Sequence, residues 1–89
     1  MTFAETPELG VLTTSNVLEG APILMVSHDD DDGGWQFLCG ETNDPAHGRI
    51  VHLAAIIALD STVCEVADLP LGWVAFRDCA GGSWAREPR

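Results

Sequence analysis

The stretch that decides the fold is ILMVSHDDDDGGWQFLCG, residues 23–40, in which two apolar runs flank four aspartates and two glycines. Each apolar run is long enough to form a strand. The pair Asp32-Gly33 between them is a strong short-range signal for a tight turn between antiparallel strands. The stretch therefore predicts a β-hairpin whose tip carries the four aspartates, which we call the acidic tip: Asp29, Asp30, Asp31 and Asp32.

Strands and turns extend outward from this hairpin. On its N-terminal side, β-branched residues predict a strand at residues 10–14, and residues 15–20 read as a single helical turn or a tight loop. Near the C-terminus, residues 73–77 (WVAFR) read as a closing strand, and the glycine-containing tail after them reads mostly as a loop.

Residues 49–70 contain an apolar stripe with helical spacing, after a strand-like start at residues 50 and 51. Asp60 interrupts the stripe, so two short helices joined near Asp60 are expected. The sequence as a whole predicts an α+β fold, in which a small antiparallel sheet (the hairpin plus the closing strand) packs against two short helices.

The length of 89 residues allows one domain. We expect residues 1–9 to form a flexible N-terminal arm, residues 10–78 a single α+β domain, and residues 79–89 a C-terminal tail. The hydrophobic fraction of 46% is typical of a folded globular protein rather than a disordered one.

The charge is strongly negative, because fourteen acidic residues stand against four arginines and no lysine, for a net charge of -10. Such a surface repels nucleic-acid phosphates and anionic lipids, so we expect neither nucleic acid nor membrane as a partner. It attracts basic proteins, at rates that fall as salt screens the charges.

Location follows from the cysteines and the apolar runs. The three cysteines are an odd number at wide spacing, which does not fit a secreted disulfide framework. The first residues lack the basic and apolar regions of a signal peptide, and no apolar run reaches the roughly 20 residues that span a bilayer. The sequence therefore predicts a cytoplasmic protein with reduced thiols.

No catalytic or metal motif is complete. An EF-hand loop needs glycine at its sixth position and glutamate at its twelfth, and neither register around Gly33 or Gly34 supplies both. The cysteines are too scattered for a typical structural zinc site. We therefore expect no cofactor, no metal and no enzymatic activity. The alternative is a small metal-binding or thiol-dependent enzyme-like domain that uses His28, Cys39 and the acidic tip.

Four short motifs, each present once, lie along residues 11–77, about three-quarters of the chain. They are Gly20-Ala21-Pro22 before a strand, the acidic tip leading to Gly34-Trp35-x-Phe37-x-x-Gly40, the pattern D-x-x-[VI] at Asp60, and LP-x-G-x-x-x-x-R at residues 69–77. This pattern resembles a family of small bacterial proteins, domain of unknown function 2185, some of whose members are labelled immunity proteins. The family pattern often has a tyrosine-arginine pair where this chain has Ser27-His28, and a serine where it has Cys39. If that arginine contacts a partner in the family, the contact is absent or altered here.

The resemblance implies a non-enzymatic protein that neutralises a toxin by masking its working surface. The expected partner is then a basic protein, such as a toxin, and a homodimer formed through an exposed sheet edge is the alternative assembly. The candidate partner-binding residues are Asp29, Asp30, Asp31, Asp32 and Trp35. The aspartates would steer the partner, and Trp35, although it also fits a packing role at the start of a strand, is the candidate anchor.

Overall fold

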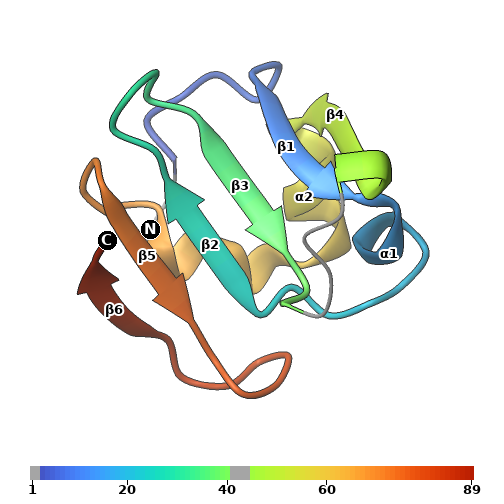
Figure 1. Cartoon of the computed structure of the whole chain (residues 1–89). Coiled ribbons are helices and arrows are strands. Elements are labelled where there is room, and N and C mark those ends of the chain that lie inside the picture. The colour runs from blue at the N-terminus through green and yellow to red at the C-terminus, as the bar shows by residue number, and fades with distance from the viewer. Residues whose placement is uncertain (1–2, 41–44) are drawn as a thin grey trace.

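The computed structural model of the chain describes residues 3–40 and 45–89 (Figure 1). The elements are, in chain order, β1 (Gly10–Thr14), α1 (Ser15–Leu18), β2 (Met25–His28), β3 (Trp35–Leu38), the 3-10 turn η1 (Pro45–His47), β4 (Gly48–His52), α2 (Leu53–Leu59), the 3-10 segment η2 (Ser61–Val66), β5 (Trp73–Phe76) and β6 (Ala85–Pro88). Within the described ranges, no helix is long and apolar enough to cross a membrane.

The six strands form one mixed sheet in the order β4-β1-β3-β2-β5-β6. β1 and β3 pair in parallel, and every other pair of neighbours is antiparallel. The predicted fold, a small antiparallel sheet of a hairpin plus a closing strand on two helices, is therefore wrong in its topology. The hairpin and the closing strand exist, but they are the centre of a larger sheet.

Three strands account for the difference. β1 lies beside β3 rather than outside the sheet, and β4 pairs with β1 along five residues, from Gly10 opposite His52 to Thr14 opposite Gly48. β6 forms within the tail that was expected to be mostly loop, and it pairs with β5 along four residues. The pairings of β1 and β4 bring together segments far apart in sequence, and turn and periodicity signals do not report such pairings.

One face of the sheet carries the hydrophobic core. In Figure 1, α2 and the segment that follows it lie behind the sheet. Alternate strand residues point toward these helices, and the fully buried cluster combines both layers: Val11, Val26, Trp35, Phe37 and Ala75 from the strands, and Leu53, Ile56, Val63 and Val66 from α2 and η2. The first backbone N–H groups of α2 are satisfied by the N-terminal segment, because Leu53 N and Ala54 N donate to the carbonyls of Leu9 and Pro7 at 2.9 Å.

The other face of the sheet, which we call the open face, carries no helix on the near side of Figure 1. The strand registers align one residue from each strand in a row: Ile50, Leu12, Gln36, Ser27, Val74 and Glu87. The next row includes Leu38, Met25 and Phe76. Val74 is buried and yet is not a member of the core cluster, as its place on the opposite face requires.

Candidate functional site

The acidic tip is the turn of the β2–β3 hairpin, as the sequence predicts. The two strands pair antiparallel from Met25 opposite Leu38 to His28 opposite Trp35. Backbone bonds close the turn, because Asp29 N donates to Gly34 O at 2.8 Å and Gly33 N donates to Asp29 O at 3.0 Å. Gly33 has φ = 74°, in the left-handed region that favours glycine, so the Asp-Gly signal reflects a real conformational need.

The four aspartates of the tip divide into one structural residue and three exposed ones. Asp29 is 18% exposed in its side chain and accepts three hydrogen bonds. Ser27 Oγ at 2.7 Å and Arg89 Nη1 at 3.0 Å bond its Oδ1, and Gln36 Nε2 at 2.7 Å bonds its Oδ2. The other three aspartates are exposed. Asp29 therefore fixes the base of the tip, while the other three present charge to the solvent.

Trp35 does not lie at the surface. Its side chain is 2% exposed and stacks on His28, with ring centroids 3.9 Å apart. Phe3 packs against it edge-on at 5.0 Å, and its Nε1 donates to Glu5 Oε2 at 2.8 Å. The sequence pointed to Trp35 as the anchor for a partner, but at 2% exposure it offers almost no surface to one, although it is among the residues that line the groove described next. Of the five candidate residues, the exposed site retains Asp30, Asp31 and Asp32.

A shallow groove of about 360 Å³ joins the tip to the open face. Its lining includes Leu12 and Ile50 from the open face, and Asp31 and Asp32 from the tip. One carboxylate oxygen from each of Asp29, Asp31 and Asp32 lies within 4.8 Å of the others. Of these three carboxylates, that of Asp29 already accepts three hydrogen bonds, and those of Asp31 and Asp32 are exposed.

The structure does not bring together the residues of the alternative thiol site. His28 is opposite Trp35 at the tip end of the hairpin, whereas Cys39 follows Leu38 at the other end, about 13 Å away along the strands. Cys39 is 1% exposed and belongs to the core. The Nδ1 atom of His28 lies 2.7 Å from Leu69 O, and its ring packs on Trp35, so both side chains have structural roles.

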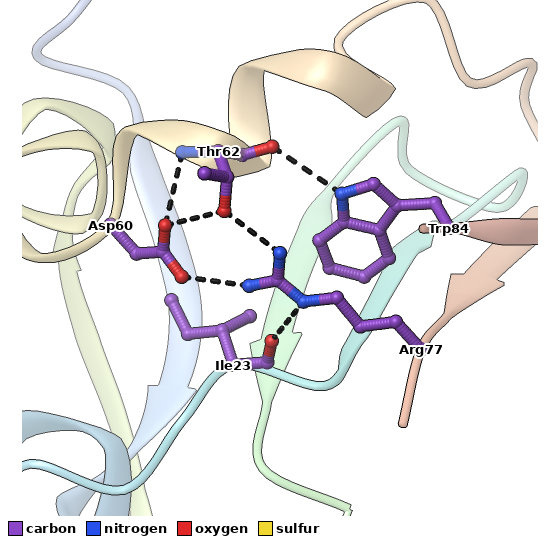
Figure 2. A network of polar contacts seen from close by, with 5 residues as sticks. All are labelled: Ile23, Asp60, Thr62, Arg77 and Trp84. Carbon is purple, nitrogen blue, oxygen red and sulfur yellow. Dashed lines mark hydrogen bonds and ion pairs between the residues drawn. The ribbon is translucent and has the colours of Figure 1, made fainter. Parts of the chain in front are cut away.

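A second polar cluster surrounds the buried guanidinium of Arg77 (Figure 2). Its Nη2 donates to Asp60 Oδ2 at 2.7 Å, its Nη1 to Thr62 Oγ1 at 2.8 Å, and its Nε to the carbonyl of Ile23 at 3.0 Å. The ring of Trp84 covers it at 4.1 Å, and Trp84 Nε1 donates to Thr62 O at 3.3 Å. The side chain of Arg77 is 0% exposed, and each of its three nitrogens donates a hydrogen bond within the chain. The cluster therefore stabilises the fold and leaves no donor of Arg77 free to bind a ligand.

Comparison with protein-family models, curated proteins and solved structures finds no match to this chain. The resemblance therefore rests on the sequence motifs alone. Three of these motifs meet at the Arg77 cluster: Asp60 and Arg77 form its ion pair, and the residue after Gly20-Ala21-Pro22, Ile23, supplies the carbonyl. The motifs thus mark residues that hold the fold together.

The carboxyl group of Asp60 couples this cluster to pH. Burial of the carboxyl acts to raise its pKa, but the hydrogen bonds from Thr62 Oγ1 and Thr62 N, together with the bond and charge of Arg77, outweigh it. The pKa of Asp60 therefore lies below its usual value. Since the folded state binds this proton less tightly than the unfolded chain, the stability that Asp60 provides is present above about pH 4 and is lost as the pH falls through the lowered pKa.

We accordingly expect the urea midpoint of the protein to fall between about pH 5 and about pH 2.5, and to fall less steeply in Asp60→Asn. The control is Asp78→Asn, which removes an exposed carboxyl outside the cluster. Its urea midpoint should fall with pH as steeply as that of the unmodified chain. Urea unfolding followed by tryptophan fluorescence at several pH values provides the comparison. Equal slopes for Asp60→Asn and the unmodified chain would show that Asp60 is not responsible.

Two features of the site were not predicted from the sequence. One is Arg89, the last residue, which reaches Ser27 Oγ at 2.7 Å and Asp29 at 3.0 Å, and no local pattern indicates this contact. The other is the open face, for which a signal exists. The run ILMV is apolar at every position, and a strand of this kind carries apolar side chains on both faces of its sheet.

Proposed function

We propose that this chain is a non-enzymatic, acidic binding protein whose partner is a basic protein. In line with the resemblance, its activity would be that of an immunity-type inhibitor, which neutralises a toxin by covering the toxin's working surface. The observation that carries the proposal is the exposed charge of Asp30, Asp31 and Asp32 at the end of the hairpin. A cytoplasmic location fits this role and the unpaired thiols of Cys39, Cys64 and Cys79.

The cations of the chain leave this charge unbalanced. Arg77 pairs with Asp60, Arg86 with Asp68, and Arg89 with Asp29. Arg49 donates to the backbone carbonyls of Ala46 and Gly48. Within the described residues, no ion pair involves the three exposed aspartates of the tip. Their charges therefore sum with the overall charge of -10 and attract a cationic surface.

Steering of this kind acts mainly on the rate of association. Charges at the rim of an interface accelerate the encounter and set its salt dependence, whereas buried contacts set the rate of dissociation. Because the Debye length shortens from about 10 Å at 0.1 M salt to about 3 Å at 1 M, the attraction of the tip is largely screened at high salt. No bond in the partner needs to be made or broken, since occupation of its surface is sufficient.

The experiment that tests the proposal is a pull-down from native cell lysate with the immobilised chain, at about 50 and about 500 mM salt. We expect a basic protein to be retained at low salt and weakened at high salt. A tip variant with Asp30→Asn, Asp31→Asn and Asp32→Asn should retain several-fold less of it and still fold, since asparagine keeps the oxygen of Asp32 that accepts from Gly34 N at 2.7 Å.

The matched control variant carries Glu19→Gln, Glu65→Gln and Asp78→Asn, which removes the same number of exposed charges away from the tip. It should retain nearly as much of the partner as the unmodified chain. If the tip and control variants lost the same amount of retained partner, net charge and not the position of the tip would explain the binding. If the unmodified chain retained no basic protein, the proposal would be contradicted.

A further inference from the structure

We infer that the open face of the sheet is the contact surface for this basic partner, and that the partner lays an apolar patch across it with its cationic side chains beside the acidic tip. The inference rests on the proposed function and adds where the partner binds. The tip alone explains attraction, whereas the open face supplies apolar area that a complex can bury.

The open face is apolar over most of its width. Ile50 is 70% exposed and Phe76 is 41% exposed, and both lie on it. Between them, the half-buried side chains of Leu12, Leu38 and Met25 also point to this side. Strands with apolar residues on both faces are typical of sheets that are covered on both sides. In the described part of this chain, helices cover one side only, and on the other side Arg89 reaches Ser27 in the middle of the face.

The polar residues in the middle of the open face do not oppose burial. Ser27 is 1% exposed and Gln36 is half-buried, and each donates a 2.7 Å hydrogen bond to Asp29. A buried polar group is costly when its hydrogen bonds are lost, and these bonds remain inside the chain when a partner covers the face. A partner therefore needs no matching polar group for Ser27 or for the amide nitrogen of Gln36. Beside them, Arg89 pairs with Asp29 inside the chain, so its charge is already balanced when a partner covers this point.

The open face is too small to form a stable interface without the acidic tip. Six strands about 4.8 Å apart, with two residue rows, give a face of roughly 24 by 14 Å, or on the order of 340 Å². A stable interface buries about 800 Å² on each partner, so the face alone is too small. The groove lined by Ile50, Leu12, Asp31 and Asp32 makes the face and the tip continuous. An occupant that covers both meets apolar and acidic surface side by side.

Charge decides what the occupant is. A second copy of this chain brings another net charge of -10 to the same face, with a second acidic tip beside it. Charges of like sign in an interface disfavour association, whereas an apolar surface flanked by lysine or arginine complements both parts of this one. The occupant is thus a basic protein and not a second copy.

The test compares two double variants against the unmodified chain. The face variant, Ile50→Thr with Phe76→Thr, removes the two exposed apolar side chains and keeps residues that favour strands. The matched control, Leu18→Gln with Leu59→Gln, removes leucines that are 39% and 51% exposed on α1 and α2. Thermal melts establish that both fold. We then measure their dissociation from the partner retained by the unmodified chain, and a benzophenone probe, Phe76→benzoylphenylalanine, tests for direct contact.

We expect the face variant to dissociate about tenfold faster or more, the control to dissociate at the unmodified rate, and the probe to crosslink the partner. A partner that both variants hold equally would overturn this inference and leave the proposed function standing. Retention of nothing by the unmodified chain would overturn both. Sedimentation of the unmodified chain as a dimer, and of the face variant as a monomer, would assign the face to a second copy instead.

Discussion

The variant Arg77→Met is expected to lose about 3–5 kcal/mol of its free energy of unfolding, because it removes one partner of a buried ion pair. The side chains of Arg77 and Asp60 are 0% and 20% exposed. Without the guanidinium, the Asp60 carboxylate keeps only its bonds from Thr62, and the carbonyl of Ile23 loses its donor. Methionine preserves most of the apolar packing under Trp84, so the loss reports the polar contacts.

The control for this variant is Arg86→Met. Arg86 pairs with Asp68 at the same 2.7 Å, but the two side chains are 34% and 48% exposed. Exposed pairs contribute little, so only a small change in stability is expected. Urea unfolding of the three proteins measures both effects. A similar small loss in Arg77→Met and Arg86→Met would show that the buried network is not a main support of the fold.

The variant Trp35→Ala is expected to lose about 3–5 kcal/mol, as large-to-small changes of buried aromatic residues do. Trp35 packs against Phe3, His28 and Phe37, so its removal leaves a cavity where the N-terminal segment meets the sheet. Trp35→Phe, which keeps a ring in place and loses the bond to Glu5, should cost much less. If Trp35→Ala kept its stability and lost only its partner, Trp35 would be the surface anchor that its position in the sequence indicates.

The sequence predicts the parts of this fold that local signals determine. The strand at residues 10–14 has the bounds of β1, and the Asp-Gly turn specifies the β2–β3 hairpin. The break at Asp60 also appears, since Asp60 separates α2 from η2 and its Oδ1 accepts from Thr62 N at 3.0 Å. In each case, the chain near the residue is sufficient to set the conformation.

The rest depends on contacts between distant segments. The sequence Ala-Arg-Glu-Pro of β6 has no apolar alternation, and it lies at the edge of the sheet through its pairing with β5, with Arg86 also bonded to Asp68 and the carbonyl of Glu65. The strand-like start at residues 50 and 51 became the full strand β4 through its pairing with β1. Trp35 is covered by Phe3 and Glu5, from a segment that resembles a loose arm in sequence.

The acidic tip also combines a feature set by local sequence with one set by distant contacts. Its place at the end of a hairpin was predictable, because four aspartates and two glycines cannot continue either strand. The separation of Asp29 from the other three was not, since its ion pair comes from Arg89, 60 residues away in the chain, in addition to bonds from Ser27 and Gln36. For this reason the proposal assigns the steering charge to three aspartates and not four.

Steering by the acidic tip is measured by the association rate of the retained partner with the tip variant, divided by its rate with the matched control variant, at about 50 mM salt. Both variants have the same net charge, so the ratio isolates where the charge lies. If the tip steers the partner, the tip variant associates several-fold more slowly and the ratio approaches one at about 500 mM salt. A ratio of one at low salt would contradict the claim that Asp30, Asp31 and Asp32 steer a basic partner.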